Sequence, residues 1–115
     1  MRILFTGHRN RFANPADLEK VAADYPGATW MHGGAIGFDS QVDSYARAHG
    51  IHTEVHLPDY AQYGRRAPLV RNDEMLETCD GVVALWDGRT IGGTYYVLRK
   101  ARQERKPIRL LRARD

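Results

Sequence analysis

Short apolar runs alternate with amphipathic stretches along this chain of 115 residues. Each run is typical of a strand buried on both faces, and the stretch after it repeats its apolar residues at helical spacing. Expected strands cover residues 3–6, 28–31, 53–57, 81–86 and 108–111, and expected helices about 15–25, 38–49, 68–79 and 94–105. Strands that alternate with helices form parallel sheets. We therefore predict a single three-layer α/β domain over residues 1–115, with a five-stranded, mostly parallel sheet and helices on both faces.

Composition limits the functions that the chain can have. Hydrophobic residues make up 43% of it and charged residues 27%, as in soluble globular proteins, and no apolar run is long enough to span a membrane. The single Cys79 excludes an internal disulfide and leads us to expect a cytoplasmic protein. The net charge is only +3, but basic residues gather near the C-terminal end: Arg99, Lys100, Arg102, Arg105, Lys106, Arg109, Arg112 and Arg114. They form either a solvated helix face with a frayed tail or a surface for nucleic acid.

Two glycine clusters stand between an expected strand and the helix after it. The first reads H-G-G-A-I-G-F-D from His32 to Asp39, and the second is Gly92-Gly93-Thr94. Glycine lets a ligand approach the main chain, and a helix N-terminus presents free N–H groups and a positive dipole end to an anion. Neither cluster fits the dinucleotide fingerprint or the P-loop. The alternative is that these glycines serve only tight turns.

Further polar residues fall at the expected carboxyl edge of the sheet, where ligands of α/β proteins bind. Gly7, His8 and Arg9 follow the first strand, and Arg71 and Asn72 open the third helix. Arg71 would neutralise phosphate and Asn72 would bind ligand or a glycine loop, unless Asn72 is a structural, fully bonded residue. The Tyr-rich segment 59–66 is expected to be a loop. No histidine or cysteine spacing indicates a metal site.

Two carboxylates, Asp39 and Asp43, lie four residues apart at the start of the second expected helix. They either favour the helix N-terminus electrostatically or act on a ligand, with Asp39 accepting from a ribose hydroxyl. If the protein is a hydrolase, Asp39, Asp87 or Asp43 is the candidate general acid–base.

Taken together, these motifs resemble the SLOG superfamily, and most closely its small YspA/cpYpsA-related branch. The superfamily includes DNA-processing protein A and the Lonely Guy, lysine-decarboxylase-like phosphoribohydrolases. The resemblance rests on G-H-R after the first strand, H-G-G-A-x-G-x-D, R-N-x-x-M and a late G-G-T, in that order. It implies a Rossmann-like fold that holds a nucleotide-derived ligand. The phosphoribohydrolases carry an acid after their second glycine loop, where this chain has Tyr95 and Tyr96.

The resulting hypothesis is a nucleotide-binding sensor or processing enzyme, with no certain cofactor and with a homodimer as the expected assembly. The dimer would use the tyrosines of residues 60–63. The alternative is a nucleic-acid-binding module that uses the basic C-terminal helix. The expected ligand-binding residues are Gly7, His8, Arg9, His32, Gly33, Gly34, Gly37, Asp39, Arg71, Asn72, Gly92, Gly93 and Thr94.

Overall fold

A computed structural model describes residues 1–113 of the chain, and its centre is a sheet of five strands. The strands are β1 (Arg2–Gly7), β2 (Thr29–His32), β3 (Thr53–Val55), β4 (Gly81–Leu85) and β5 (Ile108–Leu111). They pair in the order β3-β2-β1-β4-β5, and every pairing is parallel. The predicted α/β fold is confirmed, with an entirely rather than mostly parallel sheet.

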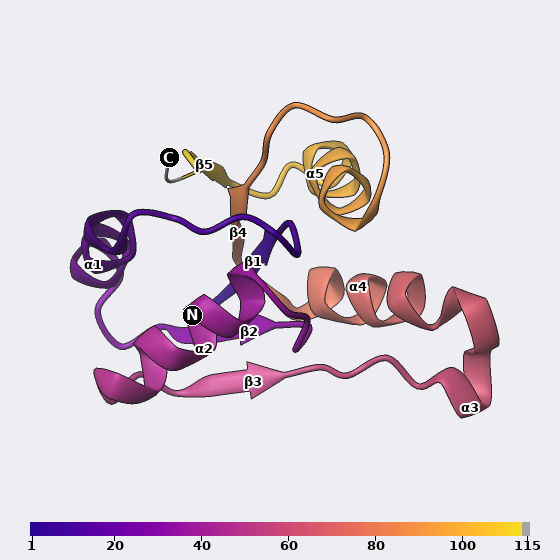
Figure 1. Ribbon diagram of the computed structural model, residues 1–115, viewed down its shortest axis with the longest axis horizontal. Coiled ribbons are helices and arrows are strands. Elements are labelled where there is room, and N and C mark those ends of the chain that lie inside the picture. The colour runs from indigo at the N-terminus through magenta and orange to yellow at the C-terminus, as the bar shows by residue number, and fades with distance from the viewer. Residues whose placement is uncertain (114–115) are drawn as a thin grey trace.

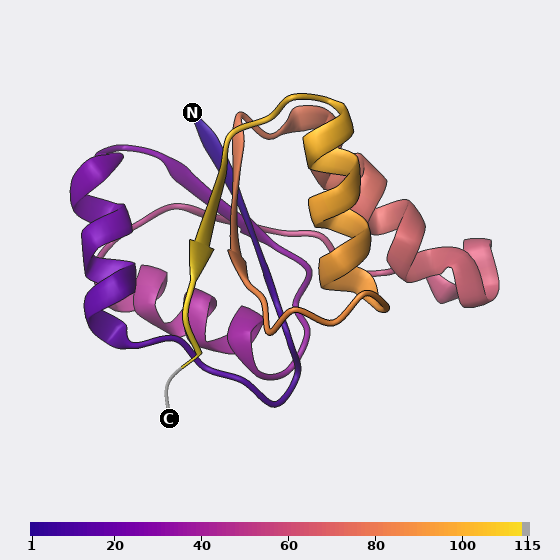
Figure 2. The ribbon, with the colours of Figure 1, turned by 90° about the horizontal axis from the view of Figure 1, so that it is seen from above.

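Helices cover both faces of this sheet (Figures 1 and 2). On one face lie α1 (Pro15–Asp24) and α2 (Phe38–Ala48), and on the other α4 (Ala67–Thr78) and α5 (Gly93–Gln103). A short helix α3 (Tyr60–Tyr63) and a 3-10 turn (Gly64–Arg66) extend past the start of α4. No helix within residues 1–113 is long and apolar enough to cross a membrane.

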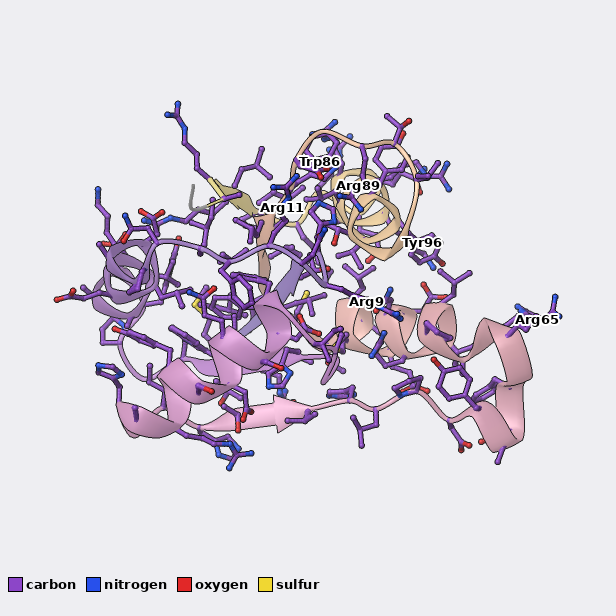
Figure 3. All side chains as sticks on the ribbon, in the orientation of Figure 1. Arg9, Arg11, Arg65, Trp86, Arg89 and Tyr96 are labelled. Atoms are coloured by element: carbon purple, nitrogen blue, oxygen red, sulfur yellow. The ribbon has the colours of Figure 1, made fainter. Side chains whose placement is uncertain are left out.

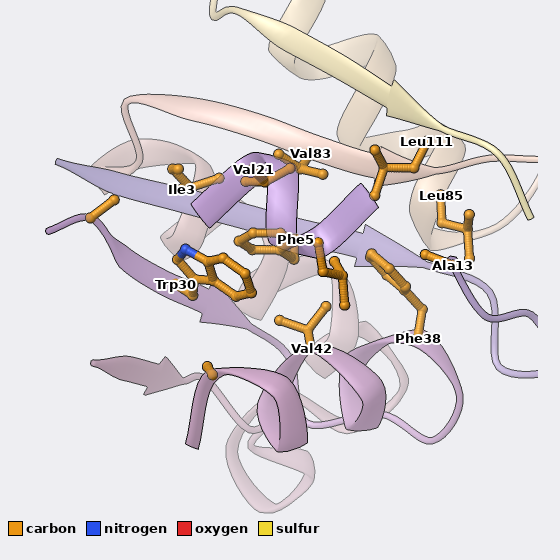
Figure 4. Close-up of a cluster of buried hydrophobic side chains, with 13 residues drawn as sticks. Ile3, Phe5, Ala13, Val21, Trp30, Phe38, Val42, Val83, Leu85 and Leu111 are labelled. Carbon is orange, nitrogen blue, oxygen red and sulfur yellow. The ribbon is translucent and has the colours of Figure 1, made fainter. Parts of the chain in front are cut away.

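Alternation along β1 gives each face its own core. Ile3 and Phe5 point to α1 and α2, where Phe5 packs against Trp30 with ring centroids 4.4 Å apart (Figure 4). Leu4, between them, points to α4 and α5. Because both faces of the central strand are covered, β1 and β4 are almost wholly apolar in the middle of the sheet.

The strand order reverses between β1 and β4. The chain runs from β1 outward to β2 and β3, and then crosses to β4 and β5 on the other side. Gly7 at the end of β1 lies opposite Leu85 at the end of β4, and the loops after them diverge to opposite faces. Parallel sheets of this type bind ligands at such a crevice. The ends of β1 and β4 are therefore the edge at which we expect a ligand.

Two details of the helices differ from the sequence-based expectation. Of the expected loop 59–66, residues 60–66 are helical, because the Asp59 side chain caps α3 by accepting a hydrogen bond from the Gln62 N–H at 3.1 Å. Leu69, expected in the core, is 41% exposed, and Met75 packs inward with Leu76 and Cys79. Strand β3 also ends early, at Val55, because its partner β2 stops at His32.

Gly37 is the N-cap of α2 and packs against the backbone of His8 and Arg9 just after β1, and its substitution tests how tightly these segments meet. Its φ is +81°, and an added Cβ would overlap the carbonyl oxygen of Arg9. We expect Gly37→Ala to lower the free energy of unfolding by about 3 kcal/mol or more, from backbone strain plus overpacking. Gly50→Ala is the control: its φ is +67° with nothing within 4 Å, so the cost should be about 1 kcal/mol. Equal losses in urea denaturation would contradict the close contact.

Candidate functional site

A cavity of about 540 Å³ opens at the carboxyl edge, between the ends of β1 and β4 and the starts of α4 and α5. It brings together nine of the thirteen expected ligand-binding residues: Gly7, His8, Arg9, Asp39, Arg71, Asn72, Gly92, Gly93 and Thr94. Gly33 and Gly34 line an adjoining hollow, and His32 faces a third one on the far side of the loop. The Gly37 main chain contacts His8 and Arg9 and lines none of the three hollows.

The first glycine loop is held from inside the protein. Asp39 Oδ2 accepts hydrogen bonds from the N–H groups of Gly33 at 3.1 Å and Ala35 at 3.2 Å. The N–H of Gly34 between them donates to His32 Nδ1 at 3.0 Å. The amides of Gly33, Gly34 and Ala35, which the sequence suggested as phosphate-binding donors, therefore already have partners within the protein. The loop shapes the cavity wall, and its amides are not the free donors that an anion needs.

His32 links this loop to α2. Because Nδ1 accepts from Gly34, the ring proton sits on Nε2, which donates to Asp43 Oδ1 at 2.8 Å. The second oxygen of Asp43 accepts from Arg47 Nε at 2.6 Å. The hydrogen bond from Arg47, followed by that from His32, holds the pKa of Asp43 below its ordinary value. Asp43 thus supports the loop through His32 and does not line the large cavity.

The three candidate carboxylates have different surroundings. Asp87 pairs with the guanidinium of Arg89, which keeps the pKa of this carboxyl far below its ordinary value. Asp39 is 8% exposed, and its burial raises the pKa of the carboxyl although backbone N–H groups and nearby His32 and Arg71 oppose the rise. Its Oδ1 has no hydrogen-bond partner among the described residues, and its side chain lines the cavity. Of the three, Asp39 is the one suited to contact a ligand.

Arg71 fastens the glycine loop to α4. Its Nη1 donates to the carbonyl oxygens of Gly33 at 2.5 Å and His56 at 3.3 Å, and its Nε donates to Asn72 Oδ1 at 2.9 Å. A Cβ at position 33 would overlap the guanidinium, so residue 33 must be glycine for this packing. Asn72 is buried. Its Oδ1 accepts this hydrogen bond from Arg71, and its Nδ2 lies toward Gly93.

The second glycine loop, by contrast, faces open space. An added Cβ at Gly92 would meet nothing within 4 Å, and one at Gly93 would meet only Asn72 Nδ2, at 3.6 Å. The loop opens the eleven-residue helix α5, and Thr94 behind it contacts Thr6 with hydroxyl oxygens 3.4 Å apart. This helix N-terminus and its dipole are directed at the cavity edge.

Arg9 and His8, which follow β1, also line the cavity. Arg9 is exposed, and its side chain forms no hydrogen bond within residues 1–113, so its whole guanidinium is free for a ligand. His8 is buried and accepts the Asp87 N–H at Nε2, at 3.2 Å, and burial lowers the pKa of its imidazole. His8 is therefore an uncharged wall residue. The described residues contain no group of three side chains that could hold a metal ion.

Sequence reasoning missed several lining residues, namely Leu69, Arg89, Ile91 and Tyr96. Ile91 directly precedes the second glycine loop and is 76% exposed. An apolar residue next to a glycine loop was the sequence signal that could have identified it as a lining residue. Tyr96 lies one turn into α5, and its hydroxyl donates to Asp73 Oδ1 at 2.7 Å. Its spacing of four residues from Gly92, about one helical turn, was the available signal.

The burial of Asp39 predicts a pH dependence of stability. A carboxyl whose pKa is raised in the folded state destabilises that state as the pH rises above its unfolded value of 3.8. Asp39→Asn keeps an acceptor oxygen for both amides and removes the ionisation. We expect the free energy of unfolding of this variant, relative to the parent, to increase from acidic to neutral pH.

Asp43→Asn is the matched control, with the opposite sign. The lowered pKa of Asp43 stabilises the folded state above pH 3.8, and this contribution is lost as the pH falls. The Asn variant should therefore lose stability relative to the parent at neutral pH and recover it in acid. If chemical denaturation showed the free energies of unfolding of both variants, relative to the parent, changing in the same direction with pH, the raised pKa of Asp39 would be contradicted.

Comparison with known proteins agrees with this architecture. The model of the YspA, cpYpsA-related SLOG family matches residues 1–63, which run from β1 through α3 and include the first glycine loop. The Gene 61 protein of Mycobacterium phage D29 is 33% identical over 88 residues, covering 71% of this chain and 70% of the phage protein. No solved structure is a significant match. On these matches, the chain belongs to the YspA, cpYpsA-related SLOG family.

Proposed function

We propose that the protein binds a nucleotide-derived anion in the 540 Å³ cavity. The observation that carries this proposal is the open second glycine loop at the N-terminus of α5, in the same cavity as Arg9 and Arg71. A helix N-terminus and two guanidinium groups are a complementary setting for phosphate. Nucleotide-related ligands are also what membership of the SLOG family suggests in general.

In this proposal the phosphate lies over the α5 loop rather than over the first glycine loop. The amides of Gly33, Gly34 and Ala35 already donate to Asp39 and His32, and a phosphate there would have to displace these bonds. The role of Gly33 and Gly34 is then to form the wall next to the ligand. The free Oδ1 of Asp39 accepts from a sugar hydroxyl.

The site favours binding over cleavage by the phosphoribohydrolase route. That route uses an acid after the second glycine loop, and here Tyr95 and Tyr96 occupy those positions. Tyr96 is committed to Asp73, which also accepts from Lys100 Nζ at 2.7 Å. We propose a sensor of the nucleotide, or an enzyme that relies on Asp39, the one buried cavity carboxylate among the three candidates.

Gly93→Val tests the phosphate position. The new side chain would fill the space over the α5 N-terminus, and its Cβ would have only Asn72 Nδ2 within 4 Å, at 3.6 Å. We expect a melting temperature near that of the parent without ligand, and no ligand-induced shift. The parent, with nucleotide at a hundred times its dissociation constant, should gain about 2.7 kcal/mol of stability.

Gly34→Val is the comparison for this variant. Gly34 has φ +71°, and an added Cβ would lie 2.6 Å from Leu57 Cδ2, so the unliganded variant should itself be less stable. A Gly93→Val protein that still binds AMP or ADP as the parent does would show that the phosphate lies elsewhere.

Nucleic-acid binding by the basic C-terminal helix is the alternative proposal. The exposed face of α5 carries Arg99 and Arg102, with Arg105 just beyond it. Other cations of this region have partners: Lys100 with Asp73, Lys106 with the Cys79 carbonyl and Arg109 with Asp24. Arg114 lies outside the described residues. Binding to DNA should weaken steeply with salt, whereas nucleotide binding in the cavity should not.

A homodimer is also proposed, with an interface at the tyrosines of α3. Tyr60 is 57% exposed and Tyr63 39%, and Leu57 beside them is 69% exposed. Such aromatic and apolar exposure is typical of interface cores. We expect light scattering at micromolar concentration to give twice the 13.1 kDa of one chain, and a mass equal to one chain would contradict the dimer.

A further inference from the structure

A second hollow of about 300 Å³ adjoins the large cavity on the side of α3. The two hollows share four lining residues: Arg9, Ala35, Pro68 and Arg71. Beyond this shared wall, the smaller hollow is lined mainly by Ile36, Pro58 and Tyr60, together with the backbone of Gly33 and Gly34. The binding edge is therefore one cleft with two lobes that meet at two arginines.

The meeting point of the lobes carries two guanidinium groups, one for each of two linked phosphates. Arg9 makes no side-chain hydrogen bond within the described part of the chain, and Arg71 uses Nη1 and Nε but leaves Nη2 without a partner there. Asp39 faces only the larger lobe. Two neighbouring guanidinium groups match the two adjacent charges of a diphosphate.

The smaller lobe has the chemistry of a pocket for a flat ring. Its walls are Pro58, Pro68, Ile36 and the ring of Tyr60, and it contains no carboxylate. Tyr60 lines this lobe and is 57% exposed, so its ring is accessible to a stacking partner, and in the proposed dimer it borders the interface formed by Tyr63 and Leu57. Bases stack on aromatic side chains without regard to their hydrogen-bonding edge.

We infer that the ligand is a dinucleotide, with its diphosphate reaching from the α5 N-terminus to Arg9 and Arg71 and its second base in the lobe of Tyr60. This inference rests on the proposed function, since the first nucleoside occupies the larger lobe beside Asp39. It adds the class of ligand: two nucleosides joined through a diphosphate, rather than a mononucleotide.

The test compares AMP, ADP, ADP-ribose and NAD by isothermal titration. We expect NAD to bind at least about tenfold more tightly than ADP, because stacking of a second base is worth that much. ADP-ribose has the diphosphate and second sugar but no second base, and should resemble ADP. An affinity for NAD equal to that for ADP, or an affinity for ADP-ribose equal to that for NAD, would overturn the inference.

Variants at Tyr60 locate the second base. Tyr60→Ala should weaken NAD about tenfold and leave ADP unchanged, and Tyr60→Phe should retain NAD. Tyr63→Ala is the control, since Tyr63 lines neither lobe. Loss of ADP and NAD binding to the same extent in Tyr60→Ala would contradict a separate pocket for the base.

Variants at the arginines locate the diphosphate. Arg9→Ala should weaken ADP and NAD more than AMP, by about tenfold or more. Arg65→Ala should change none of them, since Arg65 stands at the outer end of the segment after α3, well away from Arg9 (Figure 3). If AMP and ADP bind but NAD gains nothing, nucleotide binding stands and the dinucleotide fails. If none of the four compounds binds, the proposed function itself fails.

Discussion

The carboxylate of Asp39 is the group on which the binding edge of this protein depends. One of its oxygens holds the amides of Gly33 and Ala35, and so fixes the turn between β2 and α2. Its burial is unfavourable for a charge and raises its pKa, and two backbone donors with nearby His32 and Arg71 offset only part of this cost. The turn in turn positions the carbonyl of Gly33 for Arg71. Loop, carboxylate and arginine form one connected unit.

The two glycine clusters look alike in sequence and differ in the structure. Both stand between a strand and a helix, and both contain adjacent glycines, so the sequence places them correctly at one edge of the sheet. What distinguishes them is the partner of each amide, which depends on Asp39 and His32 in the first loop. A sequence pattern predicts where an amide is but not whether another side chain has already taken it.

The strands and long helices were predictable because each has a strong local signal. Val82 and Val83 lie in a continuous apolar run, and Asn14 with Pro15 marks the start of α1, where the Asn14 side chain accepts from Ala16 N–H. The lobe of Tyr60 was not predictable in this way. It depends on α3 following β3 at a distance set by Pro58 and Asp59, and on Arg71 reaching back across from α4. Such contacts join residues far apart in sequence, and no local period reports them.

The strand order has a consequence for how the protein acquires its site. Gly7 and Leu85 lie opposite each other but are separated by most of the chain, and the cavity is lined from both sides of that pairing. Long-range parallel pairing is slow because the intervening chain must first be ordered. The candidate cleft therefore forms only once β4 has docked beside β1. A nascent chain that has emerged only as far as α3 carries the first glycine loop and Tyr60 but has no cleft in which to use them.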